Sequence, residues 1–439
     1  MIGLGQGWTN TYQFIDEWGN NTFSYGSSVL QDDATGNYIW LVNASGAESQ
    51  IKVINTEGEV LSTNVLIGWG GVVDLQKTSD GGYLARAGTR IVKLNSSFNV
   101  EWGSEPIPLQ NEVFQWGYPF VNDVKEASDG GYILTGSLPW WDPNTGTIHT
   151  YNMYIRKLNA NGSEEWLTST FGAGHTQGAS VLEYNDGYIV IVDNAEDKWA
   201  TTASNSLLSK YSLNGDLLSS IPLVDANNNP DPSGKIIPTA DGNYIVYGSK
   251  KNLNSESSVE SDKDIWIKKI DFNGEFIWEK FYGHGFLDYT SSVRETTDGG
   301  YIISGAADLP WEFMGLFESC CMRKIWVLKT DFSGDTLWTK EWSNNNQDDQ
   351  DYGYDVIEAN DGDYVVTGTI LDLNIMTNQA IIVKFSPPFI TSINESMTEY
   401  NKTLRSITNL LGQEIPIRKN TPMFYIYDDG SVEKKIIIE

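Results

Sequence analysis

The sequence predicts an all-β fold: a seven-bladed β-propeller closed by an N-terminal strand and followed by a small C-terminal β module. Three observations predict it. A glycine-containing turn followed by a tyrosine recurs seven times at intervals of 45 to 63 residues, each unit has the pattern of four short strands, and the last unit lacks its fourth strand. The turn tyrosines are Tyr38, Tyr83, Tyr132, Tyr188, Tyr244, Tyr301 and Tyr364.

The sixth unit shows the four expected strands most clearly. Strand A covers 292–296, and the glycines of the following Asp-Gly-Gly make a tight hairpin because they tolerate positive φ. Strand B covers 301–305, strand C covers 325–330, and a second hairpin occupies 331–334. Strand D carries a tryptophan in four units, at Trp102, Trp166, Trp278 and Trp338.

Ring closure is an independent expectation. The seventh unit reaches its third strand at 381–385 and then meets Pro387-Pro388, so its fourth strand is missing. The segment 8–12, Trp-Thr-Asn-Thr-Tyr, resembles the strand D segment 278–282 and would complete the last blade, which removes two exposed sheet edges. We therefore expect a signal-peptide remnant at 1–6, the propeller at 7–388 and the C-terminal module at 389–439.

Composition excludes several classes of protein. The chain has 439 residues, 58 of them acidic and 29 basic, for a net charge of −29. Such a surface repels phosphate backbones and anionic lipid, so we expect no nucleic-acid partner, and no apolar stretch is long enough to span a membrane. Two cysteines exclude a disulfide scaffold; the adjacent Cys320-Cys321 would form either a vicinal disulfide or two free thiols. We expect a monomer.

The repeats also resemble a known group. Asp-Gly-Gly-Tyr turns, followed by a lysine-bearing strand and an Asn-Gly or Ser-Gly turn, are similar to the propeller repeats of secreted Bacteroidota proteins. The resemblance covers nearly the whole propeller and implies its fold, but it says little about function.

The C-terminal tail resembles the sorting domain of the type IX secretion system. The matching features are the Leu-Gly-Gln turn at 411–413, the Phe-Tyr-Ile-Tyr strand at 424–427 and the Lys-Lys-Ile-Ile-Ile ending at 434–438. The resemblance implies a partner in the type IX machinery and a location outside the cell or on its outer surface. The alternative is a fibronectin-like or capping β domain.

Aromatic residues outside the repeat pattern predict a ligand-binding face. In a propeller the D–A and B–C connections share one face, and here the B–C connections are long and variable, at 138–152, 194–205, 250–264 and 309–324. Flat rings there would stack on sugars or peptides, although any of them could instead pack between blades. The candidate ligand-binding residues are Trp116, Tyr118, Trp140, Trp141, Trp199, Tyr289, Trp311 and Tyr354.

A metal site is a second candidate. The three histidines, His149, His175 and His284, lie in different units without ligand spacing, which argues against zinc. The residues at the start of strand A would ring the mouth of the central channel, and the carboxylates of Asp74, Asp123 and Asp355 could hold calcium there. The alternative is that these residues cap backbone groups. The ring positions are Ser28, Asp74, Asp123, Ser180, Lys235, Ser292 and Asp355.

A lysine recurs in strand C of six units, and such repetition indicates a scaffold role. We expect each lysine to lay its stem along a neighbouring sheet and to pair with an acidic turn residue. The six are Lys93, Lys157, Lys210, Lys269, Lys329 and Lys384.

These features favour a non-enzymatic binding or adhesion module for a glycan or an extracellular protein. No nucleophile elbow, phosphate loop or histidine-rich metal motif is present. The alternatives are a propeller glycoside hydrolase or polysaccharide lyase and a purely structural surface protein. Aromatics along one cleft with two carboxylates below would favour the enzyme, whereas scattered aromatics would favour the binding module.

Overall fold

The protein is all-β: the described part of the chain forms 31 strands and no helix, and none of its segments is a helix able to cross a membrane. The computed structural model describes residues 6–16, 18–69, 71–105, 107, 119–142, 147–169, 175–195, 205–225, 231–232, 234–251, 263–283, 287–309, 322–343, 351–372, 374–387, 404–408, 413, 415, 423–427 and 432–435.

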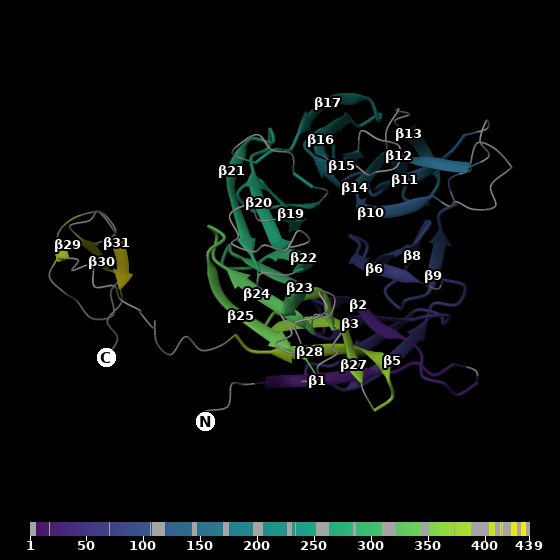
Figure 1. Cartoon of the computed structure of the whole chain (residues 1–439), viewed down its shortest axis with the longest axis horizontal. Helices are drawn as coiled ribbons and strands as arrows, with labels where there is room; N and C mark the ends of the chain where they lie inside the picture. Colours follow the sequence, from purple (N-terminus) through teal and green to yellow (C-terminus); the bar gives the residue numbers. More distant parts are fainter. Residues whose placement is uncertain are drawn as a thin grey trace, which may run out of the picture. The chain divides into compact units, whose positions relative to one another are not determined.

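Seven four-stranded antiparallel sheets form a ring, which confirms the seven-bladed propeller (Figure 1). Blades 1 to 3 comprise β2 (Ser24–Gln31), β3 (Tyr38–Ala44), β4 (Gln50–Ile54) and β5 (Val60–Val65); β6 (Val72–Lys77), β7 (Tyr83–Ala87), β8 (Arg90–Leu94) and β9 (Val100–Gly103); and β10 (Phe120–Glu126), β11 (Tyr132–Asp142), β12 (Thr147–Leu158) and β13 (Glu164–Ser169). Blades 4 to 6 comprise β14 (His175–Tyr184), β15 (Gly187–Ala195), β16 (Asn205–Ser212) and β17 (Leu217–Pro222); β18 (Lys235–Pro238), β19 (Tyr244–Lys250), β20 (Asp264–Ile270) and β21 (Phe276–Tyr282); and β22 (Tyr289–Glu295), β23 (Tyr301–Leu309), β24 (Met322–Thr330) and β25 (Thr336–Trp342).

The seventh blade contains both ends of the propeller chain. It consists of β26 (Tyr352–Glu358), β27 (Tyr364–Asp372), β28 (Thr377–Phe385) and the N-terminal β1 (Gln6–Tyr12), which pairs with β28. The expected closing strand is thereby confirmed, and β1 and β28 lie side by side in Figure 1. Closure leaves the last blade with four strands like the others.

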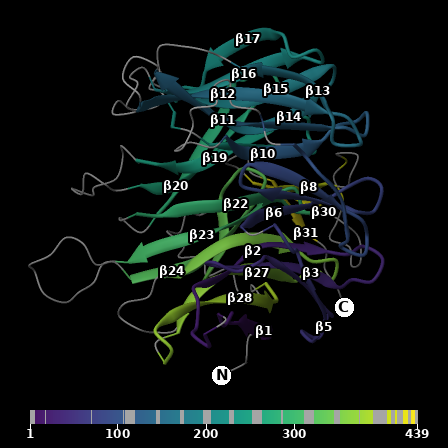
Figure 2. The ribbon, with the colours of Figure 1, turned by 90° about the vertical axis from the view of Figure 1, so that its right-hand side faces the viewer.

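The core lies between blades rather than within them. Seven clusters of buried hydrophobic residues occur, one at each contact between neighbouring blades. Strands such as β3 and β20 are buried along their whole length, because both sheet faces are covered by another blade. Figure 2 shows this stacking from the side.

The first strands of six blades share a β-bulge at the same position. The first strands of several neighbouring blades contact one another, as β2 does with β6 and β26, so strand A lines the channel. A β-bulge interrupts six of these seven strands just before the ring position, and only β18 in blade 5 pairs without one. Each bulge increases the local twist and redirects the side chain that it leaves unpaired.

The third blade differs from expectation at its B–C connection. The sequence predicts a loop over 138–152, but β11 and β12 continue into it as paired strands, with Trp140 opposite Thr150 and Trp141 opposite Ile148. Pairing satisfies backbone groups that a loop would leave to solvent.

The chain divides into two compact units, Met1–Pro387 and Pro388–Glu439. The second contains a three-stranded antiparallel sheet of β29 (Leu404–Thr408), β30 (Met423–Tyr427) and β31 (Val432–Lys435).

Candidate functional site

Five aromatic side chains form a continuous row, which we call the aromatic row: Phe23, Tyr25, Tyr354, Tyr352 and Tyr289. Successive ring centroids in this order are 5.9, 5.7, 6.0 and 6.4 Å apart. Phe23 is 44% exposed, and the four tyrosines are half-buried. The row crosses blades 1, 7 and 6, so three separate repeats build one surface.

The position of these rings follows from the strands that carry them. Tyr25, Tyr289 and Tyr352 each lie three residues before a ring position, at the end of the propeller where the D–A and B–C connections lie. We call this the loop end, and the opposite end the hairpin end. Tyr354 is the extra residue of the bulge between Gly353 and Asp355, which explains why two tyrosines of one strand join the row.

Glycine allows blades 1 and 7 to approach closely at this point. A Cβ added to Gly26 would lie 2.1 Å from Thr367 Oγ1 and 2.3 Å from Trp40 Nε1. The indole nitrogen of Trp40 donates to the Thr367 hydroxyl at 2.6 Å. This hydrogen bond joins blades 1 and 7 next to Gly26, the residue that follows Tyr25 on β2. Any larger residue would separate Tyr25 from Tyr354.

Arg323 lies against two rings of the row. Its guanidinium carbon is 4.9 Å from the ring centre of Tyr289 and 4.5 Å from that of Tyr352. Asp308, directly opposite on β23, holds it with Arg323 Nη2 donating to Oδ2 at 2.8 Å. The carboxylate fixes the cation, and the cation fixes the two rings by cation–π attraction.

Two phenols of the row, those of Tyr25 and Tyr354, are uncharged over the ordinary pH range. Burial raises the pKa of Tyr25 and of Tyr354, so both phenols stay protonated well above neutral pH. The rings therefore offer flat apolar faces with hydroxyl groups at their tips.

The predicted ligand-binding residues meet different outcomes. Tyr289 and Tyr354 lie in the same row, which the sequence did not show. Trp140 and Trp141 lie on β11, but their side chains are outside the described residues. The other four, Trp116, Tyr118, Trp199 and Trp311, also lie outside them.

Four members of this surface were not among the predicted ligand-binding residues: Phe23, Tyr25, Tyr352 and Arg323. Phe23 directly precedes blade 1 and Tyr25 is the second residue of its first strand. The signal for both was available, because closure by β1 makes 13–23 a D–A connection like those before Tyr289 and Tyr352. Arg323 carried no such signal, since only the cross-strand register places it opposite Asp308.

A smaller group lies on blades 3 and 4. The ring of Tyr151 is 6.4 Å from Phe120 and 5.4 Å from His175, whose Nε2 is 2.6 Å from Gln177 Nε2. His149 and His284 are outside the residues whose side chains are described.

The ring carboxylates bind protein groups. Asp355 accepts from Ser28 Oγ at 3.3 Å and Val29 N at 3.1 Å in blade 1, and from Ser292 Oγ at 2.8 Å in blade 6. Asp123 accepts from Ser180 Oγ at 2.7 Å and from Val181 N at 3.0 Å in blade 4. Backbone capping, the alternative to a metal, is thus confirmed for both.

Cations complete the surroundings of these carboxylates. Arg294 Nη2 is 2.9 Å from both oxygens of Asp355, and Lys125 Nζ is 2.9 Å from Asp123. Within the described residues no group of three or more histidine, cysteine, aspartate or glutamate side chains could hold a metal ion. Calcium at Asp74, Asp123 and Asp355 stays a prediction, and the donor set does not favour it.

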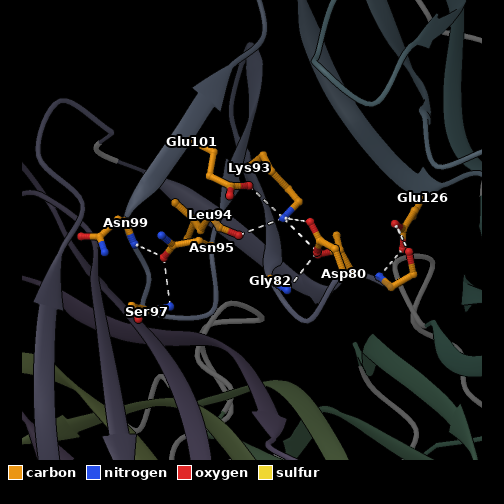
Figure 3. A network of polar contacts seen from close by, with 11 residues as sticks. Asp80, Gly82, Lys93, Leu94, Asn95, Ser97, Asn99, Glu101 and Glu126 are labelled. Carbon is orange, nitrogen blue, oxygen red and sulfur yellow. Dashed lines mark hydrogen bonds and ion pairs between the residues drawn. The ribbon is translucent and has the colours of Figure 1, made fainter.

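The repeated strand C lysines are scaffold elements. In blade 2, Lys93 is 2% exposed and its ammonium lies 2.8 Å from Asp80 and 3.2 Å from Glu101 (Figure 3). Lys157, Lys269, Lys329 and Lys384 pair likewise with the acidic residue of their own A–B hairpin. Lys210 differs: it donates to the Phe272 carbonyl oxygen at 2.7 Å.

A second repeated contact joins neighbouring hairpins. Glu126 accepts from the backbone nitrogen and hydroxyl of Ser79 in the preceding blade, both at 2.7 Å (Figure 3). Glu183 and Glu358 repeat this contact to Ser128 and Thr297. Because these contacts obey the repeat, they stabilise the ring rather than mark a site.

Comparison with known proteins assigns the chain to no family. No protein-family model matches the chain, and no curated protein does. Similar solved structures include a protein of unknown function from Bacteroides caccae (13% identity, 70% of this chain and 94% of that one, TM-score 0.40) and a streptogramin B lyase (12%, 86% and 97%, TM-score 0.45). Another is the extracellular domain of a protein assigned as a hybrid two-component system from B. thetaiotaomicron (12%, 95% and 48%, TM-score 0.46).

Proposed function

We propose that the protein is a non-enzymatic binding module that captures a glycan on the aromatic row. The observation that supports this most directly is the gathering of Phe23, Tyr25, Tyr354, Tyr352 and Tyr289 from three blades into one contiguous row. Neutral rings with polar tips suit sugars, whose faces are apolar C–H groups and whose rims are hydroxyls. An exposed apolar cluster on a rigid scaffold is typical of a recognition surface.

The rigidity of the aromatic row favours ligand binding. Arg323 is fixed by Asp308, and its guanidinium lies against the rings of both Tyr289 and Tyr352. Rings that are ordered before the ligand arrives lose little conformational entropy on binding. Tyrosine and arginine are also common anchors in protein interfaces. The alternative ligand is therefore an extracellular protein, and a ligand screen distinguishes it from a glycan.

The hydrolase or lyase alternative has weaker support. The carboxylate that holds Arg323 belongs to Asp308, which is 1% exposed and already forms an ion pair. A general acid must reach the scissile bond of the bound chain, and a paired, buried carboxylate does not.

Export is part of the proposal. The tail, which resembles a type IX sorting domain, supports secretion by that machinery to the medium or the outer cell surface, with the propeller acting there in adhesion. The acidic surface, with a net charge of −29, would keep the protein soluble outside the cell.

The test is a glycan and protein ligand screen with the full chain, followed by titration calorimetry on each hit. Replacing Tyr352 with alanine removes a ring that contacts Tyr289, Tyr354 and Arg323, and we expect about tenfold weaker binding. Phe332→Ala is the matched control, because Phe332 is 67% exposed in a C–D hairpin at the hairpin end.

Retention of no ligand, or equal affinities for Tyr352→Ala and Phe332→Ala, would contradict the proposal. Release of reducing ends from a bound polysaccharide would favour the enzyme instead.

A further inference from the structure

The mouth of the central channel carries a concentration of positive charge that the composition does not lead one to expect. The chain as a whole has two acidic residues for each basic one. Three ring positions are carboxylates: Asp74, Asp123 and Asp355. Four cations lie at or directly beside ring positions: Lys235 is itself one, Arg86 stands opposite Asp74, and Lys125 and Arg294 form ion pairs with Asp123 and Asp355. The local balance is therefore reversed.

Two of these cations are paired. Arg294 binds both oxygens of Asp355, and Lys125 binds Asp123, each at 2.9 Å. Asp74 accepts instead from Gln76 Nε2 at 2.8 Å. Arg86 and Lys235 thus face a single carboxylate that neither of them contacts in a salt bridge.

Three of the four cations act on one carboxylate, that of Asp74. Burial by itself would raise the pKa of Asp74, but Arg86, Lys125 and Lys235, with the Gln76 hydrogen bond, lower it. Lys235 belongs to blade 5 and Arg86 to blade 2, so charged residues of separate blades contribute to the same channel mouth.

Blade 5 departs from the repeat at this point. Its inner strand β18 has four residues and lacks the bulge found in the other six, and its ring position is a lysine instead of a serine or aspartate. Lys235 is exposed, and the buried Tyr247 stands opposite it on β19. In a repeat protein, a function-specific residue is expected where the repeat is broken.

Arg86 supplies an independent sign of an incomplete site. Its Nη1 donates to the Val121 carbonyl oxygen at 3.0 Å, but its buried Nε has no hydrogen-bond partner in the described structure. A buried guanidinium donor without a partner is unfavourable unless a ligand satisfies it.

We propose that the channel mouth binds one singly charged oxyanion, the carboxylate of a uronic acid or a sulfate ester, between Lys235, Arg86 and Arg294. One negative charge balances the one excess cation, and guanidinium groups suit planar or tetrahedral oxyanions. The site would accept an anion at the place where the carboxylates alone predict a cation. None of its three cations belongs to the aromatic row.

The test is titration calorimetry of the full chain with sodium glucuronate and with methyl sulfate at constant ionic strength, using neutral glucose as the reference. We expect one of the two anions to bind and glucose not to compete for it. Lys235→Gln should weaken binding about tenfold, the loss of one charge-assisted contact, and Lys235→Arg should retain it.

Lys77→Gln is the matched control. It makes the same change in net charge at the hairpin end of an inner strand, where Lys77 pairs only with the exposed Asp33 at 2.7 Å. Whichever anion binds more tightly identifies the ligand chemistry. The proposal is overturned if neither anion binds at millimolar concentration, if Lys235→Gln and Lys77→Gln behave alike, or if calcium binds and Asp355→Asn abolishes it.

Discussion

The ring of Trp8 lies 5.7 Å from the ring of Tyr38, at an interplanar angle of 62°, and the Trp8 indole nitrogen donates to the Thr56 carbonyl oxygen at 2.8 Å. The same edge contact joins Trp102 to Tyr132 and Trp338 to Tyr364 in neighbouring blades. The closing strand therefore makes the contact of an ordinary strand D, although it lies at the N-terminal end of the propeller chain, before blade 1. Ring closure depends on the chemistry of the repeat itself.

Trp8 should accordingly contribute to the stability of the whole ring. We expect Trp8→Ala to lower the free energy of unfolding by about 2 kcal/mol, through loss of ring contacts and of the Thr56 hydrogen bond. Trp18→Ala is the control, since Trp18 is 78% exposed. Urea denaturation measures both; equal midpoints would show that the contact does not stabilise closure.

Asp355 should be a second determinant of closure, because it joins blades 6, 7 and 1. Asp355→Asn keeps the shape of the side chain but leaves Arg294 without its counter-charge, and we expect a loss of about 2 kcal/mol. Asp33→Asn removes a carboxylate that is 79% exposed and should change little. Thermal unfolding monitored by circular dichroism compares them, and similar melting temperatures would refute the role.

The hairpin ion pairs predict loss of stability in acid. Hydrogen bonds from Lys93 and Thr78 lower the pKa of Asp80 to about 2, from an ordinary value of 3.8. A carboxyl with a lowered pKa in the folded state stabilises the protein above its unfolded pKa, and that stability is lost as pH falls from about 4 to about 2. Denaturation midpoints should fall over this window, and less steeply in Asp80→Asn; an unchanged slope would contradict the assignment.

Lys52 predicts the opposite dependence on the alkaline side. Its ammonium is buried 3.5 Å from the ring centre of Tyr12 and 3.2 Å from Thr63 Oγ1, and burial lowers its pKa to about 8 from 10.5. The unfolded chain binds the proton more tightly, so this group makes stability increase between about pH 8 and pH 10. We expect Lys52→Met to be more stable than the wild type at pH 7 and to lose this increase; lower stability at pH 7 would contradict it.

Much of the architecture could be predicted because it is written into a repeat. Turn glycines, the tyrosines after them and the strand D tryptophans recur at positions that the blades require, and the missing fourth strand identified β1. The hairpin lysines were predicted for the same reason, with Lys210 as the exception. In blade 3, β11 and β12 extend into the predicted loop 138–152, because their backbones continue to pair beyond the residues that follow the repeat pattern.

The site was less predictable, because it is formed by contacts between repeats. Tyr289 and Tyr354 could be selected as non-repeating aromatics. Their contact with Tyr25 depends on ring closure and on the close approach of blades 1 and 7, which Gly26 permits. Arg323 joins them only through the cross-strand register.

The sequence by itself determined the number of blades, the strand order and the closing strand, since each depends on local patterns that every unit repeats. Only the tertiary structure decided which side chains share a surface and which charges meet. It brought Arg294 to Asp355 and the Ser180 hydroxyl to Asp123, so carboxylates that suggested a metal ion have protein partners. Hydrogen bonding and charge balance depend on distances across the ring, and these arise only when the ring is closed.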